Sequence, residues 1–246
     1  MRKLEISGLS FSYGEKQVLE DISFGVAEGE FVSLLGPSGC GKSTVLKLLT
    51  GILSPERGRI LVDGEEIRGL SSHFAYMPQN DLLFPWKTIL DNVCLYGRIH
   101  GSLEEMRERA REYFPVFGLE GYENSYPAAL SGGMRQRCAL IRTLAAQPKV
   151  LLLDEPFSAL DYQTRLAVSA DIYRIIRQEG KTALLVTHDI SEAISLSDRV
   201  VVLSHRPAVV KSIHRLTQLQ GVPPLQRRDH PAFAGYFKSI WKELEV

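Results

Sequence analysis

The residues best suited to chemistry form a glycine-rich run with the spacing of a phosphate-binding loop, G-x-x-x-x-G-K-[ST]. The run is Gly36, Pro37, Ser38, Gly39, Cys40, Gly41, Lys42 and Ser43, with Thr44 after it. Its glycines let backbone N–H groups converge on an anion. Lys42 adds a full positive charge, and the Ser43 hydroxyl can ligate Mg²⁺. The run predicts a site for nucleotide phosphates with Mg²⁺; a glycine-rich turn with a chance lysine is the alternative.

Two carboxylates follow an apolar strand and are the second candidate group. Residues 150–153 are all apolar and run directly into Asp154 and Glu155. Ligands of open α/β sheets bind at the carboxyl ends of strands, so both acids should face the phosphate loop. We expect Asp154 to assist Mg²⁺ binding and Glu155 to orient or deprotonate an attacking water. A strand that leaves the core through a polar turn is the alternative, which the phosphate loop disfavours.

The elements that position these groups alternate between strand and helix. A buried strand over 31–35 precedes the loop, and a helix over about 42–52 follows it. Further strands are expected over 59–62, 74–77, 150–153, 182–186 and 199–203, and helices over 162–179 and 191–196. This order predicts an α/β fold with a mostly parallel sheet. Alternating apolar residues near the N-terminus predict additional strands there.

A helical stretch interrupts the α/β pattern between about residues 85 and 148. Thr88 is a candidate N-cap, and residues 102–105 have the pattern of a capping box that opens a helix closed by Gly118. Another helix begins after Ser131. The stretch is predicted to be a lobe inserted into the core. After residue 220, Pro223 and Pro224 break the chain before an amphipathic helix over about 231–244.

Composition excludes several classes of protein. The 246 residues include 44% hydrophobic residues, enough for a core, and 29 Lys and Arg balance 29 Asp and Glu. Zero net charge gives no electrostatic reason to expect nucleic acid. No apolar run approaches the roughly 18 residues of a membrane helix, and no signal peptide is evident. Three scattered cysteines suit neither a disulfide framework nor a CxxC zinc site. We expect a soluble cytosolic protein.

The run Leu130 to Gln136 resembles the LSGGQ signature of ATP-binding cassette (ABC) proteins, with Met134 where Gln is usual. Four other family motifs match in order along the chain. They are the adenine-stacking aromatic at Tyr13, the Q-loop glutamine at Gln79, the D-loop Ser158-Ala159-Leu160-Asp161 and the switch histidine at His188. The resemblance implies a RecA-like P-loop NTPase core with an N-terminal antiparallel β subdomain and an inserted α-helical subdomain. It places the ATPase domain in residues 1–220 and a C-terminal tail in residues 221–246.

The resemblance also implies roles for individual residues. Four residues would act in ATP hydrolysis: Lys42, Gln79, Glu155 and His188. Mg²⁺ would be bound by Ser43, Gln79 and Asp154. A helix N-terminus at Ser131 suits phosphate oxygens. In the arrangement typical of the family, the nucleotide site of a second cassette would be completed by Ser131, Gly132 and Gly133. Asp161 would also lie at the nucleotide. Two ATP molecules would then lie between two head-to-tail copies of the chain.

A partner in the membrane is implied by the same resemblance. The chain would bind permease subunits at the inner face of the cell membrane, with residues 81–86 in the groove for the permease. Packing beneath the helical lobe is the other interpretation of those apolar residues. Residues 83–88 and 228–233 resemble the nitrate/sulfonate/taurine importer branch, which also works with a substrate-binding protein.

Three other functions could use some of the same motifs. A cassette ATPase acting on nucleic acid or the ribosome lacks support from charge and length. A small-molecule kinase would leave the run at 130–133 unexplained. A non-hydrolysing scaffold would leave Glu155 unexplained.

Overall fold

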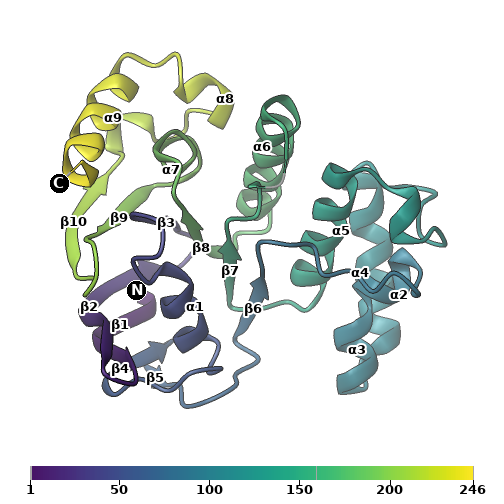
Figure 1. The fold of residues 1–246 in the computed structure, drawn as a ribbon. Coiled ribbons are helices and arrows are strands. Elements are labelled where there is room, and N and C mark those ends of the chain that lie inside the picture. The colour runs from purple at the N-terminus through teal and green to yellow at the C-terminus, as the bar shows by residue number, and fades with distance from the viewer. Residues whose placement is uncertain (1, 159, 246) are drawn as a thin grey trace.

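The computed structural model describes residues 2–158 and 160–245, which fold around two β-sheets (Figure 1). In the six-stranded sheet the order is β10-β9-β3-β8-β7-β6, and all neighbours are parallel except β10 and β9. Its strands are β3 (Phe31–Leu35), β6 (Phe74–Met77), β7 (Val150–Asp154), β8 (Thr182–Thr187), β9 (Arg199–Leu203) and β10 (Val210–Arg215). The predicted mostly parallel α/β core is confirmed.

The N-terminal part of the chain forms a separate four-stranded antiparallel sheet in the order β2-β1-β4-β5. Its strands are β1 (Arg2–Tyr13), β2 (Lys16–Ala27), β4 (Arg57–Val62) and β5 (Glu65–Glu66). The turn between β1 and β2 contains Gly14, whose φ of 60° lies where glycine carries no steric penalty. The antiparallel β subdomain implied by the family resemblance is therefore present.

The helices divide between the core and an inserted lobe. Beside the core sheet lie α1 (Lys42–Leu49), α6 (Tyr162–Gln178) and α7 (Ile190–Leu196). The lobe contains α2 (Ile89–Val93), α3 (Leu95–His100), α4 (Leu103–Val116), the 3₁₀ turn η1 (Pro127–Ala129) and α5 (Gly132–Ala145). Figure 1 shows the lobe beyond the β6 edge of the sheet, as the insertion between β6 and β7 requires. The predicted helical stretch is confirmed.

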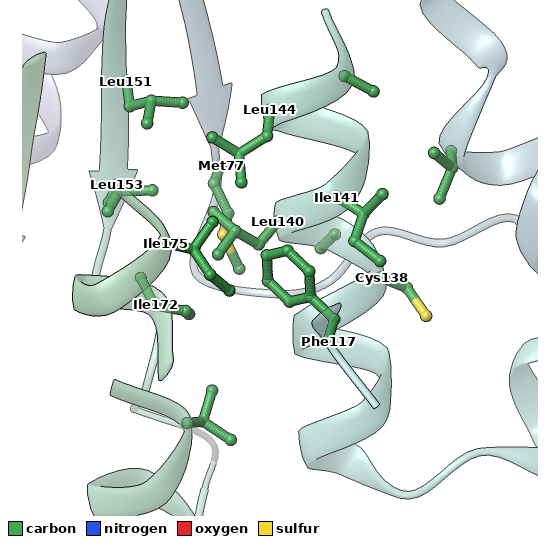
Figure 2. Packing of buried hydrophobic residues seen from close by; sticks show 14 of the residues in the cluster. Met77, Phe117, Cys138, Leu140, Ile141, Leu144, Leu151, Leu153, Ile172 and Ile175 are labelled. Carbon is green, nitrogen blue, oxygen red and sulfur yellow. The ribbon is translucent and has the colours of Figure 1, made fainter. Parts of the chain in front are cut away.

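The lobe is joined to the core by a continuous apolar cluster. Met77, Leu151 and Leu153 leave one face of the sheet and meet α5 and α6 (Figure 2). The helices contribute Leu140, Leu144, Ile172 and Ile175, and Phe117 also joins. Each fully buried side chain of this size contributes about 1.5–3 kcal/mol, so the lobe is held by packing on the sheet as well as by its two connections.

The opposite face of the sheet packs on α1. Leu152, Leu184 and Val186 lie in one cluster with Val45 and Leu49 of the helix. Because side chains alternate along a strand, β6 and β7 present one set of residues to α1 and the other to the lobe.

The end of the chain packs back onto the core. The elements after β10 are η2 (Thr217–Leu219), α8 (Pro224–Arg227) and α9 (Pro231–Leu244). Ile240 of the predicted amphipathic helix is buried with Ile194 and Val202. Arg227 is 1% exposed, and its guanidinium donates to the carbonyls of Val222, Ile194 and Ser197 at 2.9, 3.1 and 2.6 Å.

Two local predictions are wrong. The first helix ends at Leu49 instead of continuing to residue 52, because Gly51 turns the chain with a φ of 75°. The expected capping box at Ser102 is absent: α4 begins there, but the Ser102 side chain accepts no hydrogen bond. Its φ and ψ of −114° and 38° differ from the extended conformation that caps usually adopt.

Candidate functional site

The phosphate loop occupies the connection from β3 to α1, so its residues lie at the carboxyl end of a central strand. Lys42 is 5% exposed, and its ammonium donates to the Gly36 and Pro37 carbonyls at 2.8 and 3.0 Å. The loop is thus curled around the lysine charge. Gly41 has a φ of 129°, and a Cβ there would lie 2.7 Å from Leu19, so backbone and packing both require glycine.

Ser43 and Asp154 form the second part of the site. The Ser43 hydroxyl donates to Asp154 Oδ1 at 3.3 Å, and the Tyr76 hydroxyl donates to Oδ2 at 2.9 Å. Burial raises the pKa of Asp154, while the bonds from Tyr76 and Ser43 act in the opposite direction. Burial also raises the pKa of Tyr76, with a further contribution from the Asp154 charge.

A hydroxyl and a carboxylate are the oxygen donors that Mg²⁺ prefers. Within residues 2–158 and 160–245, no group of three or more His, Cys, Asp or Glu side chains could hold a metal by itself. Mg²⁺ usually binds through one or two protein oxygens together with substrate phosphates. The pair Ser43 and Asp154 fits that mode beside a phosphate loop.

Glu155 and His188 meet at the ends of neighbouring parallel strands. His188 Nδ1 lies 3.1 Å from Glu155 Oε2, and the backbone N–H of Glu155 donates to Val186 O at 2.9 Å. Glu155 has a φ of 46°, an uncommon conformation for a residue with a side chain. Glu155 directly follows Asp154, and its turned backbone places the Glu155 carboxylate against the His188 imidazole. The strand order β8-β7 explains why the two residues lie together although they are far apart in sequence.

The segment that carries His188 is supported by buried polar contacts. Thr187 donates to Glu192, and Asp189 caps α7 by accepting from the Glu192 N–H at 3.1 Å. Burial raises the pKa of the Glu192 carboxyl to about 7, and the Thr187 hydrogen bond opposes that change.

The loop containing Gln79 is bonded to α5 by two residues of the signature run and by Arg142, which the sequence did not single out. Arg135 donates to the Asp81 carboxylate at 3.0 Å, and Arg142 donates to the carbonyls of Asp81 and Leu82 at 2.7 and 3.0 Å. The Gln136 amide donates to Gln79 O at 3.4 Å. The spacing of seven residues, about two turns, was an available signal that both arginines share one helix face.

Gln79 itself lies near the site through a different contact. Its side-chain amide donates to the Ser158 hydroxyl at 3.1 Å. The Gln79 loop is therefore connected to the segment after Glu155. Ala159, the second residue of the predicted D-loop, lies outside the described residues.

The signature run is separate from the phosphate loop. Ser131 is exposed and caps α5, accepting the Met134 N–H at 3.3 Å. A Cβ on Gly133 would lie 2.8 Å from Thr164, so the glycine allows α5 to approach α6. Gly132 lies at the same exposed helix start. Among the described residues, no hydrogen bond joins residues 131–133 to the phosphate loop.

Tyr13 and Asp161 occupy the remaining predicted positions. Tyr13 lies at the β1 hairpin end, is 46% exposed and meets the Phe11 ring edge-on at 4.9 Å. Asp161 caps α6, accepting the Thr164 N–H at 3.1 Å, and that hydrogen bond lowers its pKa. Both side chains have structural contacts within the chain.

The apolar stretch after Gln79 remains partly exposed. Trp86 is 70% exposed and lies 5.2 Å from the Phe84 ring, measured between centroids. The backbone of Phe84 is fixed by Asn92, which accepts its N–H at 2.6 Å and donates to its carbonyl at 3.1 Å. No described helix is long and apolar enough to cross a membrane.

The chain matches known proteins over most of its length. A family model described as ABC transporter matches residues 19–158. YtlC of Bacillus subtilis (strain 168), an uncharacterized ABC transporter ATP-binding protein, is 46% identical over 95% of this chain and 91% of its own. An aliphatic sulfonates import ATP-binding protein, SsuB of Bacillus cereus, is 38% identical over 94% of this chain and 90% of its own.

Solved structures resemble the fold over a similar extent. A dimeric ATP-binding cassette in a post-hydrolysis state, bound to ADP and Pi, has a TM-score of 0.72 and 30% identity over 87% of this chain and 98% of its own. The ATP binding subunit of an ABC transporter has a TM-score of 0.78 and 30% identity over 99% of both chains.

Proposed function

The chain belongs to the ABC transporter family of ATP-binding ATPases, and from that premise we propose that it drives a membrane permease that imports a small anionic solute such as an aliphatic sulfonate. The cargo class is taken from relatives that are 37–46% identical and named as aliphatic sulfonate importers. Nitrate and taurine, the other cargoes of the importer branch that residues 83–88 and 228–233 resemble, are not named among these relatives.

The observation that carries the catalytic part is the convergence of two side-chain pairs at the carboxyl ends of neighbouring strands, one joined by a hydrogen bond and the other in contact at 3.1 Å. Ser43 with Asp154 and Glu155 with His188 lie at the carboxyl ends of β3, β7 and β8, next to Lys42. Lys42 would exchange its loop carbonyls for the outer phosphates of ATP. Glu155 would accept a proton from the attacking water, with His188 fixing its carboxylate.

Mg²⁺, held through Ser43 and Asp154, would neutralise phosphate charge. Gln79 lies in the loop beside Ser158, where its amide oxygen is a further candidate ligand. The remaining loop residues would bind phosphate oxygens through backbone N–H groups. Tyr13 would stack its exposed ring on the adenine.

The second half of each site would come from another copy of the chain. Ser131 is exposed at the start of α5, with half-buried Gly132 and buried Gly133 after it, and among the described residues no hydrogen bond joins them to the phosphate loop. We propose that two copies associate head to tail, so that ATP contacts Lys42 of one and Ser131 of the other. Asp161 would lie at the same interface. Loss of the terminal phosphate would then release the two copies.

The aromatic pair of half-buried Phe84 and exposed Trp86 is the proposed contact with the permease. Both residues directly follow the Gln79 loop, so movement at the permease would reach the nucleotide site through that loop. This contact would hold the chain on the inner face of the membrane. We propose residues 1–220 as the ATPase domain and 221–246 as a tail packed on it, with a substrate-binding protein acting only through the permease.

Replacing Glu155 by Gln tests this proposal. The amide cannot accept a proton, so ATP turnover should fall roughly 10²- to 10⁴-fold while Mg-ATP stays bound. The variant should form an ATP-dependent dimer, which light scattering after size-exclusion chromatography would detect. The exposed Glu120→Gln variant is the control and should retain wild-type turnover. Unchanged hydrolysis by Glu155→Gln, or a monomer that traps Mg-ATP alone, would contradict the proposal.

A further inference from the structure

Tyr76 occupies an unexpected place at the base of the candidate site. It lies on β6, which pairs in parallel with β7 so that Tyr76 is opposite Leu152 and Met77 is opposite Leu153. Met77 packs into the cluster toward the lobe (Figure 2), so alternation sends Tyr76 to the other face. That face carries α1 and therefore Ser43.

The strand register also brings Tyr76 to Asp154. Asp154 follows Leu152 by two residues and so leaves β7 on the same face. The phenol spans this diagonal and donates to Asp154 Oδ2 at 2.9 Å. Since Ser43 donates to Oδ1, the two oxygens of the carboxylate have different partners. The Asp154 plane is thereby fixed from both sides.

The ring of Tyr76 is held by its surroundings. It packs against the apolar cluster of the α1 face, and it lines a cavity of about 390 Å³ together with Ile52, Phe74 and Tyr96. The cavity lies between the end of α1 and helix α3 of the lobe. The ring therefore packs on one side and faces the cavity on the other, and its hydroxyl is directed to Asp154.

We infer that Tyr76 is a positioning residue for the Mg²⁺ site, which acts by orienting Asp154 and does not contact nucleotide. The inference rests on the proposed function. With Oδ2 bonded to the phenol, Oδ1 remains directed at the Ser43 hydroxyl, where Mg²⁺ is expected. A partner that orients a ligating or nearby carboxylate typically changes metal affinity by about 10–100-fold when it is removed.

The test measures how much Mg²⁺ is needed for nucleotide binding. A fluorescent N-methylanthraniloyl ATP is titrated into the full chain carrying Glu155→Gln, first in EDTA and then at increasing Mg²⁺. Tyr76→Phe should raise the Mg²⁺ midpoint roughly tenfold. Its nucleotide affinity in EDTA should remain within about twofold of the parent, since Lys42 and the loop are unchanged. A merely structural role would weaken binding equally in both conditions.

The control is Tyr113→Phe, because Tyr113 also donates a phenol proton to a carboxylate, Glu179, at 3.2 Å but lies in the lobe. It should leave the Mg²⁺ midpoint unchanged. Tyr76→Met is a second variant, which keeps apolar bulk without a hydroxyl and should shift the midpoint as Tyr76→Phe does. In an Asp154→Asn background, Tyr76→Phe should produce no further shift.

The outcomes distinguish failure of the Tyr76 role from failure of the proposed function. Parent protein that needs Mg²⁺, together with unshifted midpoints in both Tyr76 variants, overturns the inference and leaves the proposed function standing. Equal weakening in EDTA and in Mg²⁺ also overturns it. Parent protein that binds the nucleotide without any Mg²⁺ dependence overturns the proposed function and this inference with it.

Discussion

The phosphate loop and the signature run contain similar chemistry but have different surroundings. Around the loop, Lys42 donates to the Gly36 carbonyl at 2.8 Å and Ser43 donates to Asp154 at 3.3 Å. Beside them, Glu155 lies 3.1 Å from His188 at the end of β8. Around the signature run, Ser131 bonds to its own helix through the Met134 N–H. The first region is nearly complete within one chain, whereas the second faces outward. A helix start without an internal phosphate site is consistent with the proposed site between two copies of the chain.

The largest expected effect, on nucleotide affinity, follows from removing the positive charge of Lys42 in the phosphate loop. In Lys42→Ala, nucleotide loses a charge-assisted contact worth about 1.5–3 kcal/mol, so affinity should fall at least roughly tenfold even in the monomer. Fluorescent nucleotide titration at low protein concentration would measure this. Lys47→Ala, on the exposed face of the same helix, is the control. Wild-type affinity in Lys42→Ala would remove the basis for distinguishing the two regions.

A smaller and different effect is expected at the outward-facing region. Ser131→Ala should leave monomer nucleotide affinity unchanged but raise the ATP concentration needed for dimerisation of Glu155→Gln protein. The lost N-cap itself costs about 1 kcal/mol of helix stability. Thr88→Ala removes an equivalent cap, since Thr88 accepts the Asp91 N–H at 3.1 Å, and it controls for that cost.

Two results at Ser131 would count against the comparison. If Ser131→Ala weakens nucleotide binding by the monomer, the signature run contributes to the nucleotide site of its own chain. If Thr88→Ala impairs dimerisation equally, the effect of Ser131→Ala reflects helix stability.

The smallest expected effect concerns pH and the support of His188. The folded-state pKa of Glu192 is about 7 against an ordinary 4.5, so the folded protein binds this proton more tightly. The stabilisation of the folded state by this proton is fully present below about pH 4.5 and is lost as the pH rises toward about 7. Between pH 5 and pH 7, the melting temperature of Glu192→Gln should therefore fall by less than that of the wild type. A difference of 1 kcal/mol corresponds to roughly 2–4 °C for a domain of this size.

Calorimetry across that pH range would measure the slope. The exposed Glu120→Gln should retain the wild-type pH dependence. An identical slope in Glu192→Gln and wild type would show that the buried carboxyl does not hold its proton as the structure indicates.

Local sequence was enough to predict the groups whose neighbours are close in sequence. The strand before Asp154 and the helix after the phosphate loop follow from short apolar patterns and glycine spacing. Their meeting at one sheet edge follows from parallel strand topology. His188 was singled out only by the family resemblance, and its contact with Glu155, which was not predicted, follows from the pairing of β7 with β8.

The groups that sequence did not reveal act across elements. Tyr76 reaches Asp154 only because of the β6–β7 register, and Arg142 reaches Asp81 only because α5 packs beside that loop. The hydrogen-bond partners of such side chains are determined by tertiary packing, which no short pattern in a single sequence reveals. The failed capping box at Ser102 has the same origin: its residue types fit, but its backbone angles do not.

The buried guanidinium of Arg227 has a practical consequence for anyone who trims the chain. A version that stops at residue 220 would contain every phosphate-binding motif, yet it would leave the carbonyls of Ile194 and Ser197 without their donor. Those carbonyls end the segment that begins just after His188. We therefore expect a chain that ends at residue 220 to have a lower thermal stability than the full chain.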